Sequence, residues 1–168
     1  MFPVHQLAVW LLMASIPVMA CGCCAGSSPK REAEETARLQ KSCDASHAKD
    51  CGLLGVRYAN GLGVPKDMAR AYAAYQRACD LGDMPGCSVV GYDFEAGQGV
   101  PRDLVRAVSF YKKACDGGDD WGCTSLGEMY EKGKGVPFDR AAAIRLYRQG
   151  CRSSQGACDD LRRMGETP

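Results

Sequence analysis

This sequence contains little histidine and has almost no net charge. Only two histidines, His5 and His47, occur among 168 residues, and His5 falls in a segment that we expect to be removed. That leaves too little for a histidine-based zinc site or a catalytic triad that uses histidine. The 21 basic and 20 acidic residues leave a formal net charge of +1. Because no basic excess exists to attract phosphates, we expect no nucleic-acid partner.

The composition excludes disorder. Apolar residues make up 46% of the chain and charged residues 24%, which is too hydrophobic for a chain that stays unfolded. A length of 168 residues is that of one compact domain. The chain should therefore fold as a single unit, and its 20 glycines indicate many turns.

The first twenty residues contain no Asp, Glu, Lys or Arg. Their apolar stretch has the length of a signal-peptide core and is short for a membrane-spanning helix. We expect a signal peptide over residues 1–20 and a tether rich in small residues over 21–31. The residues before Cys21 resemble a bacterial lipobox, which predicts a lipid on Cys21. Plain secretion and a retained structural cysteine are the alternatives.

The cysteines reveal a repeat of 36 residues. One series is Cys43, Cys79, Cys115 and Cys151, and the other is Cys51, Cys87 and Cys123, followed by Cys158. Between them, Leu-Gly or Val-Gly, an aromatic residue, Gly-x-Gly-Val-Pro, Asp, Ala and Tyr recur in register. Such a period indicates a repeat protein, and we expect its domain to span residues 32–165 with three full units and incomplete units at both ends.

Each unit contains the pattern of two helices. In the first unit, apolar residues recur at helical offsets up to Tyr58, and Gly61 stands where a helix ends. Asp67 is suited to cap the second helix, whose packed stripe includes Tyr75. We therefore expect an all-α fold built from helical hairpins. Residues 32–42 and 159–164 should form single capping helices, because their polar substitutions suit an outer face.

The spacing favours local disulfide bonds. In three units seven residues separate the two cysteines, and in the fourth six do. The predicted pairs are Cys43–Cys51, Cys79–Cys87, Cys115–Cys123 and Cys151–Cys158. Thiolate ligation of a metal or haem is the alternative, but Cys21, Cys23 and Cys24 lie too close together for a tetrahedral site. We expect no metal and no cofactor.

The matched columns resemble SEL-one-like repeats, which are relatives of the tetratricopeptide repeat. The paired cysteines are similar to the bacterial cysteine-rich repeat proteins often catalogued as Hcp. The resemblance covers about residues 43–158 and implies a right-handed superhelical solenoid, export and disulfide-locked hairpins. It also implies two functions, since such proteins act as protein-interaction scaffolds and as binders or slow hydrolysers of β-lactams.

An enzyme of the second kind needs an activated serine with a lysine one helical turn away. Ser109 and Lys112 are the one Ser-x-x-Lys pair on a predicted helix, so they are weak catalytic candidates. The Ser-Asp-Asn and Lys-Thr-Gly elements of serine β-lactamases are absent. The equivalent columns of neighbouring units vary in the manner of a solvated face, and we assign no catalytic residue.

A partner would meet the variable columns of the first helices, on the concave face of the solenoid. These columns are apolar in the first unit and acidic in the third; they include Val56, Ser88, Tyr92, Glu95, Glu128 and Glu131, with Trp121 beside them. Tyr92 is either a partner contact or a structural cover, Trp121 is favoured as structural, and the glutamates are either solvated or meet a basic peptide.

The sequence thus predicts an exported interaction module of the bacterial envelope, which binds a protein or peptide and touches the membrane only through a lipid anchor. The alternative is a protein that binds or weakly hydrolyses a β-lactam or binds a cell-wall ligand.

Overall fold

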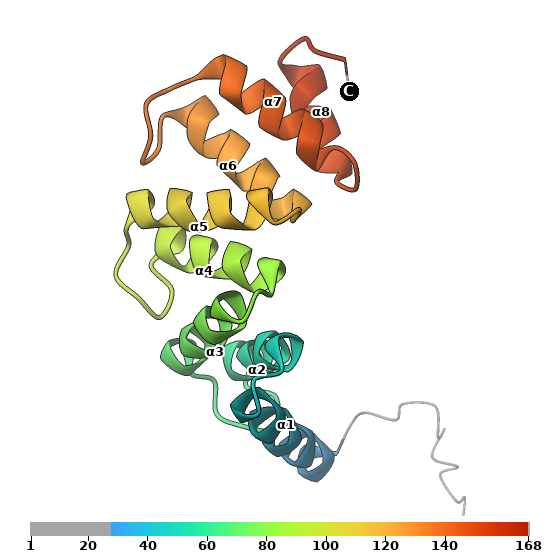
Figure 1. Ribbon diagram of the computed structural model, residues 1–168. Helices are drawn as coiled ribbons and strands as arrows, with labels where there is room; N and C mark the ends of the chain where they lie inside the picture. The colour runs from blue at the N-terminus through green and yellow to red at the C-terminus, as the bar shows by residue number, and fades with distance from the viewer. Residues whose placement is uncertain (1–27, 168) are drawn as a thin grey trace, which may run out of the picture.

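The computed structural model describes residues 28–167, which form α-helices and no strand. Successive helices pack antiparallel and stack into a right-handed superhelical solenoid (Figure 1), which confirms the predicted fold class. The helices are α1 (Pro29–Asp44), α2 (Ala48–Asn60), α3 (Met68–Asp80), α4 (Met84–Ala96), α5 (Leu104–Asp116), α6 (Asp120–Lys132), α7 (Arg140–Gly150) and α8 (Gln155–Arg163).

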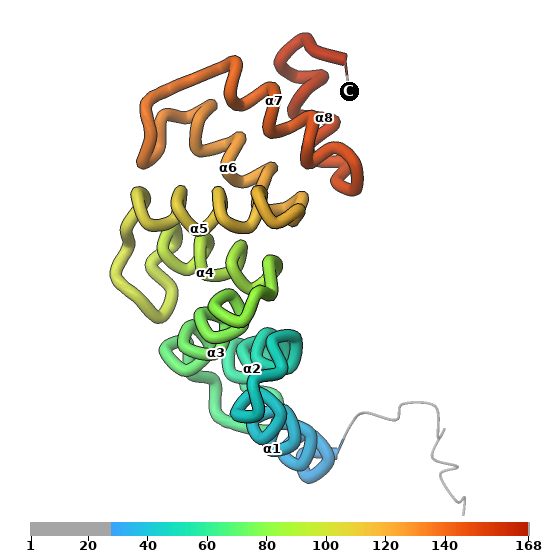
Figure 2. The backbone as a smooth tube through the Cα atoms, in the orientation of Figure 1, coloured from blue at the N-terminus to red at the C-terminus, as the bar shows by residue number. Residues whose placement is uncertain are grey.

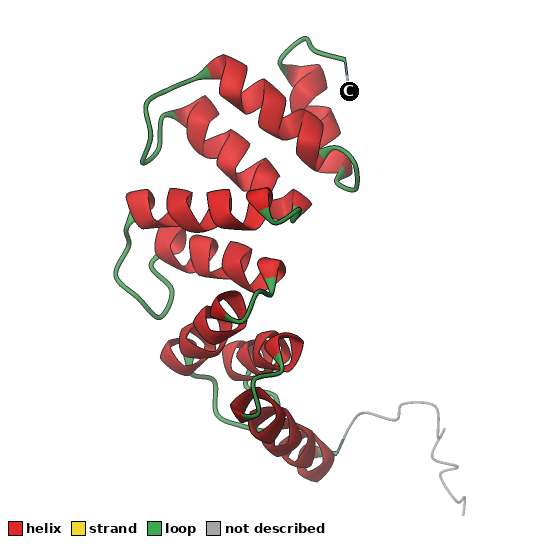
Figure 3. Ribbon diagram, in the orientation of Figure 1, coloured by secondary structure: helices red, strands yellow, loops and turns green. Residues whose placement is uncertain are grey.

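The stack is curved. Its two ends, α1 and α8, lie on the same side of the curve, as the backbone tube shows (Figure 2). The long loops that follow α4 and α6 lie along one edge, whereas the short turns that precede α4 and α6 lie along the opposite edge (Figure 3). We call α2, α4 and α6 the first helices of the three repeats, and α3, α5 and α7 the second helices.

The long loops are fixed by residues at both of their ends. The first helices end at Gly61, Gly97 and Gly133, which adopt φ angles of 71°, 72° and 60°. This left-handed conformation is one that glycine adopts without steric cost. Each second helix begins with an aspartate whose side chain accepts a hydrogen bond from a free backbone amide, as Asp67 does from Arg70. The loops therefore repeat because their end residues do.

A glycine on each first helix packs directly against a tyrosine of the paired second helix. A Cβ atom at Gly55 would lie 2.5 Å from Cε1 of Tyr75, and one at Gly91 would lie 2.7 Å from Cδ1 of Tyr111. Side chains do not approach this closely, so only glycine allows the two helices to come together. This contact confirms the expectation that tyrosine rings fill the space over the small residues.

Four disulfide bonds confirm the predicted pairing: Cys43–Cys51, Cys79–Cys87, Cys115–Cys123 and Cys151–Cys158. Their Cα atoms lie 4.5–4.8 Å apart. Each bond joins a second helix, or α1, to the helix that follows it. Closing a loop of eight or nine residues stabilises the fold by about 2–3 kcal/mol per bond.

The two end helices are longer than the sequence suggested. Pro29 opens α1, and Ser28 caps it by accepting a hydrogen bond from the backbone amide of Arg31 at 3.4 Å. Residues 29–31, which we expected in the tether, are therefore helical because a serine cap followed by proline starts a helix well. At the other end, α8 begins at Gln155, four residues before the expected start, because Ser154 caps it.

The expected signal peptide, the first part of the expected tether and Cys21 lie outside the described residues. Among residues 28–167, no helix has the length and apolar character needed to cross a bilayer.

Candidate partner-binding face

The outward side chains of the first helices line two hollows at successive joints between repeats. The first, which we call the apolar hollow, has a volume of about 420 Å³ and lies between α2 and α4. Leu53 and Val56 of α2 remain 53% and 41% exposed there. Its lining is mainly apolar and consists of Lys49, Gly52, Leu53, Val56, Tyr75, Asp83, Pro85, Gly86 and Val89.

The second, which we call the acidic hollow, has a volume of about 270 Å³ and lies between α4 and α6. Its lining consists of Tyr92, Glu95, Tyr111, Trp121, Ser125 and Glu128. The two hollows are the same feature one repeat apart, because their linings align at the 36-residue period. The aligned pairs are Val56 and Tyr92, Tyr75 and Tyr111, Pro85 and Trp121, and Val89 and Ser125.

Two aromatic rings form one wall of the acidic hollow. The ring centroids of Tyr92 and Trp121 lie 6.4 Å apart with a tilt of 44°. The two residues cover each other in part, yet they remain 42% and 44% exposed. Exposed aromatic rings at a joint between helices have the character of interface anchors.

Each of the two helices also supplies one carboxylate to the lining, Glu95 from α4 and Glu128 from α6. Glu95 accepts a hydrogen bond of 3.0 Å from the hydroxyl of Tyr111, whose pKa is raised by burial and by this carboxylate. Lys134 lies 3.4 Å from Glu95, and Lys132 lies 2.6 Å from Glu128. Both lysines are half exposed, so these ion pairs are weak. Neither lysine lines the hollow, which therefore offers two carboxylates and no cation.

Glu131 does not belong to this site. Arg163 of α8 donates to both of its carboxylate oxygens, at 2.6 and 2.9 Å, and the hydroxyl of Tyr147 donates at 2.7 Å. The hydrogen bonds from Arg163 hold the pKa of Glu131 at about 2, well below its usual value. Among the candidate glutamates, Glu131 is thus committed to the end of the solenoid, whereas Glu95 and Glu128 face the acidic hollow.

Two further residues differ from the sequence expectation. Ser88, placed on the exposed stripe, is fully buried and its hydroxyl donates to the side chain of Asp119 in the next turn. Its column contains only small residues, Gly52, Ser88 and Thr124, which was the available signal for burial. Tyr111 was assigned to the core alone; its ring is buried, but its hydroxyl reaches the acidic hollow.

Ser109 and Lys112 lie one turn apart on α5, away from the two hollows. The hydroxyl of Ser109 donates to the carbonyl of Arg106 at 2.7 Å, and Lys112 pairs with Asp116 at 2.6 Å. The hydrogen bond with Asp116 raises the pKa of Lys112 above its usual value. A lysine that acts as a base needs a lowered pKa, which is the opposite direction, and both side chains are bonded to other groups.

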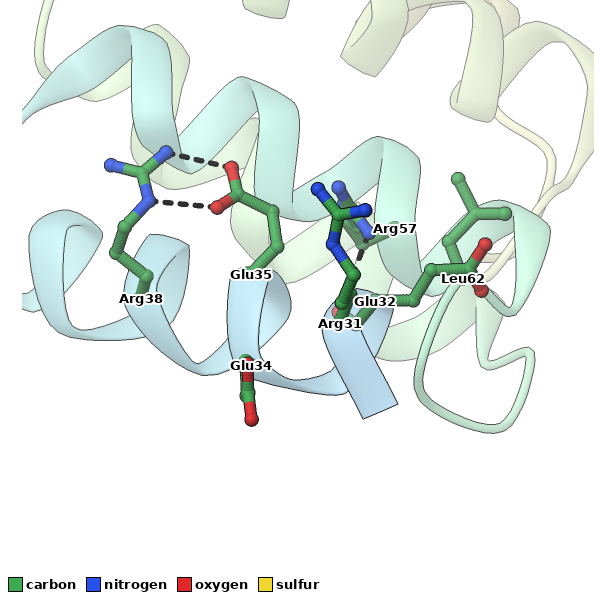
Figure 4. A pocket seen from close by; sticks show the side chains of 7 residues that line it. All are labelled: Arg31, Glu32, Glu34, Glu35, Arg38, Arg57 and Leu62. Atoms are coloured by element: carbon green, nitrogen blue, oxygen red, sulfur yellow. Dashed lines mark hydrogen bonds and ion pairs between the residues drawn. The ribbon is translucent and has the colours of Figure 1, made fainter. Parts of the chain in front are cut away.

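A third cleft, of about 730 Å³, lies at the N-terminal end and is lined by charged side chains of α1 with Arg57 and Leu62 (Figure 4). Glu35 and Arg38 form two hydrogen bonds there, of 2.7 and 2.8 Å, and Figure 4 shows Glu34 pointing away from them. Glu35 stands in the column of the buried Ala71. The cleft therefore marks the side of α1 against which a preceding first helix would pack, and its charges suit an end cap.

No group of three or more His, Cys, Asp and Glu side chains is placed to hold a metal ion within residues 28–167.

The structure thus defines a class of protein, an all-α solenoid of helical hairpins with hollows at two of the joints between repeats. The sequence profile of the Sel1 repeat matches residues 51–83, 86–119 and 122–154, so the chain belongs to the Sel1 repeat family. The matches correspond to the three pairs of first and second helices. Proteins built from Sel1 repeats are generally helical scaffolds for protein interactions.

Solved structures of Sel1 repeat proteins share the fold. A Sel1 repeat protein from Oxalobacter formigenes is 28% identical with a TM-score of 0.71, over 77% of this chain and 52% of its own. The protein c5321, a protective antigen of uropathogenic Escherichia coli, is 26% identical with a TM-score of 0.73, over 82% and 33%. The chain therefore spans about half of the first protein and a third of the second.

The Helicobacter pylori cysteine rich protein B is 29% identical with a TM-score of 0.64, over 81% of this chain and 99% of its own. Among curated proteins, none matches the sequence.

Proposed function

We propose that the protein is an exported scaffold of the bacterial envelope that binds a segment of a protein or peptide partner on the concave face of its first helices. The observation that supports this function is the pair of hollows at consecutive joints, since each repeat adds one hollow to a continuous surface. Exposed Val56, Tyr92 and Trp121 supply the apolar and aromatic contact area that such binding requires.

Four disulfide bonds support export, because such bonds persist in oxidising compartments. We further propose that residues 1–20 act as a signal peptide and that lipid on Cys21 holds the scaffold at the membrane. Metabolic labelling with a radioactive fatty acid tests the anchor. Label should enter the wild-type chain and be lost in Cys21→Ser, and equal labelling of both would refute the anchor.

Site-specific crosslinking tests the binding face. A photoreactive amino acid replaces Val56 in one variant and Val105 in a control; Val105 is 67% exposed on α5, a second helix. In living cells the first variant should form a discrete adduct with an envelope protein, and the control should not. Tyr92→Ala, added to the first variant, should reduce the adduct at least fivefold because it removes the aromatic wall of the neighbouring hollow.

Equal adducts from both positions, or an adduct that Tyr92→Ala leaves unchanged, would contradict binding on this face.

A further inference from the structure

We infer that the bound segment carries an apolar side chain and a basic side chain three residues apart, in an extended conformation, with the apolar residue in the apolar hollow and the basic residue in the acidic hollow. The inference rests on the proposed function and names the chemistry of its partner.

The acidic hollow fits a Lys or Arg side chain in two respects. Glu95 and Glu128 supply negative charge, and no cation lines the hollow. Tyr92 and Trp121 supply two exposed rings in the same lining. A cation over an aromatic face is attracted by the ring, and the aliphatic stem of Lys or Arg packs well on an apolar surface. A side chain that is basic at its tip and apolar along its stem matches both the carboxylates and the rings.

The ion pairs already present do not oppose this binding. Glu128 and Lys132 are i,i+4 neighbours whose side chains are 46% and 49% exposed, and Lys134 approaches Glu95 from a loop at 3.4 Å. Pairs of this exposure contribute little to stability. A basic side chain that is also held by the rings can therefore replace or share these contacts.

The apolar hollow has a different preference. Leu53, Val56, Pro85 and Val89 dominate its wall, and exposed Leu53 and Val56 of α2 are aliphatic, whereas Lys49 and Asp83 supply one charge of each sign. Burying aliphatic area favours a complex, whereas burying an unpaired charge there is costly. This hollow therefore selects an aliphatic residue such as leucine.

The geometry of the repeats sets the distance between the two residues. First helices α4 and α6 contact each other directly, and packed helices lie about 8–10 Å apart. A polyproline II segment has three residues per turn and rises about 3.1 Å per residue. Residues three apart therefore lie on the same side of such a segment, separated by about 9 Å, which matches one repeat step.

Fluorescence anisotropy with defined peptides tests the inference on the oxidised chain. The probes are labelled, acetylated peptides with the core Leu-Pro-Pro-Lys and its reverse, Lys-Pro-Pro-Leu, because the two hollows fix the spacing and not the chain direction. One of the two should bind at least tenfold more tightly than the matched peptide in which Glu replaces Lys. Shortening the core to Leu-Pro-Lys should lose most of this gain.

Protein variants assign each side chain to its hollow. Glu128→Gln should weaken binding of the Lys peptide about fivefold and leave binding of its Lys→Ala version unchanged. The control Glu34→Gln, at an exposed position of α1, should affect the binding of neither peptide. Leu53→Ser should weaken the Leu peptide and leave its Leu→Ala version unchanged. Val105→Ser is the control for that change, since Val105 is also exposed but lies on a second helix.

Two results would overturn the inference: equal binding of the Lys and Glu peptides, or an effect of Glu128→Gln that does not depend on the peptide's lysine. Either result would leave the proposed function standing if the Val56 adduct in cells still depends on Tyr92. If the Val56 adduct no longer depended on Tyr92, the proposed function itself would be contradicted. Failure of the peptide chemistry and failure of the proposed function are therefore distinguishable.

Discussion

The second repeat (α4 and α5) and the third repeat (α6 and α7) carry the same polar contact and use it differently. In each, a tyrosine hydroxyl of the second helix donates to a glutamate of the first helix. The bond joins Tyr111 to Glu95 at 3.0 Å and Tyr147 to Glu131 at 2.7 Å. The next helix then supplies Glu128 in one case and Arg163 in the other.

The residue at this aligned position, Glu128 or Arg163, determines whether the joint between repeats is open or closed. Arg163 occupies the column of Glu128, since each lies five residues after the second cysteine of its pair. Glu128 leaves a second negative charge beside Glu95 and an open hollow, whereas Arg163 neutralises Glu131 with two hydrogen bonds. One side chain of the neighbouring helix thus determines whether a joint between repeats is an open hollow or is closed by an ion pair.

A buried position also carries an acidic residue in the second repeat and an uncharged residue in the third. Asp93 of α4 and the equivalent Met129 of α6 are both buried, 3% and 1% exposed. One carboxylate oxygen of Asp93 has no hydrogen-bond partner, and burial raises its pKa to about 7. The second repeat therefore retains a buried carboxyl group, Asp93, that the third repeat replaces with an apolar side chain.

Removing the disulfide bond at either end of the third repeat should give the largest difference between the two joints. Cys115→Ala with Cys123→Ala unlinks the second repeat from the third, and the free energy of unfolding should fall by about 2–3 kcal/mol. Cys151→Ala with Cys158→Ala unlinks only α8, so hydrogen exchange should show loss of protection confined to that helix. Urea unfolding followed by circular dichroism measures the first effect; an equal global loss in both variants would contradict the comparison.

Replacing Asp93 by methionine, the residue of the third repeat, should stabilise the protein by about 2 kcal/mol at pH 8. Because burial raises the pKa of Asp93, the folded state binds a proton more tightly than the unfolded state, and stability falls as the pH rises from the ordinary pKa of an aspartate to about 7 and then levels off. The advantage of Asp93→Met should therefore grow between pH 5 and pH 7 in urea titrations and level off by pH 8. A difference that is constant across this range would show that Asp93 does not ionise there.

Arg163→Ala should open the third joint at a cost of about 1 kcal/mol at pH 7. The pKa of Glu131 is lowered to about 2, so its ionised form stabilises the fold above its ordinary pKa and this stabilisation disappears as the pH falls towards 2. In urea titrations, the difference in the free energy of unfolding between wild type and Arg163→Ala should therefore become smaller as the pH falls from the ordinary pKa of glutamate towards 2. Arg162→Ala is the matched control, because Arg162 pairs only with exposed Asp159 and should have little effect.

Ser109→Ala should have the smallest effect, within about 0.5 kcal/mol on stability, since it lies on the solvated face of α5. Peptide binding at both hollows should be unchanged. Any hydrolysis of a chromogenic β-lactam by the oxidised chain should also survive the substitution. Turnover that is abolished by Ser109→Ala alone would instead identify an enzyme.

The sequence predicted the fold well because its strongest constraints are local and repeated. A glycine that ends a helix, an aspartate that starts one and two cysteines within a turn each act over a few residues, so the 36-residue period displays them directly. The difference between Glu95 and Glu131 was not predictable in this way. It depends on α8, whose cysteine is one residue out of register, so that Arg163 does not fall where the period would place it.

Burial of Ser88 depends on a contact across the joint between repeats, because its hydroxyl meets Asp119 of the next repeat. The dual role of Tyr111 depends on a contact within the second repeat, because its hydroxyl meets Glu95 of α4. The first contact needs the angle at which two units pack, and the second needs the angle at which the two helices of one unit pack, so neither follows from the sequence pattern alone.

The placement of the four disulfide bonds along one edge has a consequence for proteolysis. Exposed Gly82 lies inside the loop that Cys79 and Cys87 close, so a protease that cuts there leaves both fragments covalently joined through sulfur. A cut in the long loop after Gly61 has no bridge across it and separates α2 from α3. A protease that cuts the long-loop edge therefore separates the chain into two fragments, whereas one that cuts the disulfide-bonded edge leaves the fragments joined.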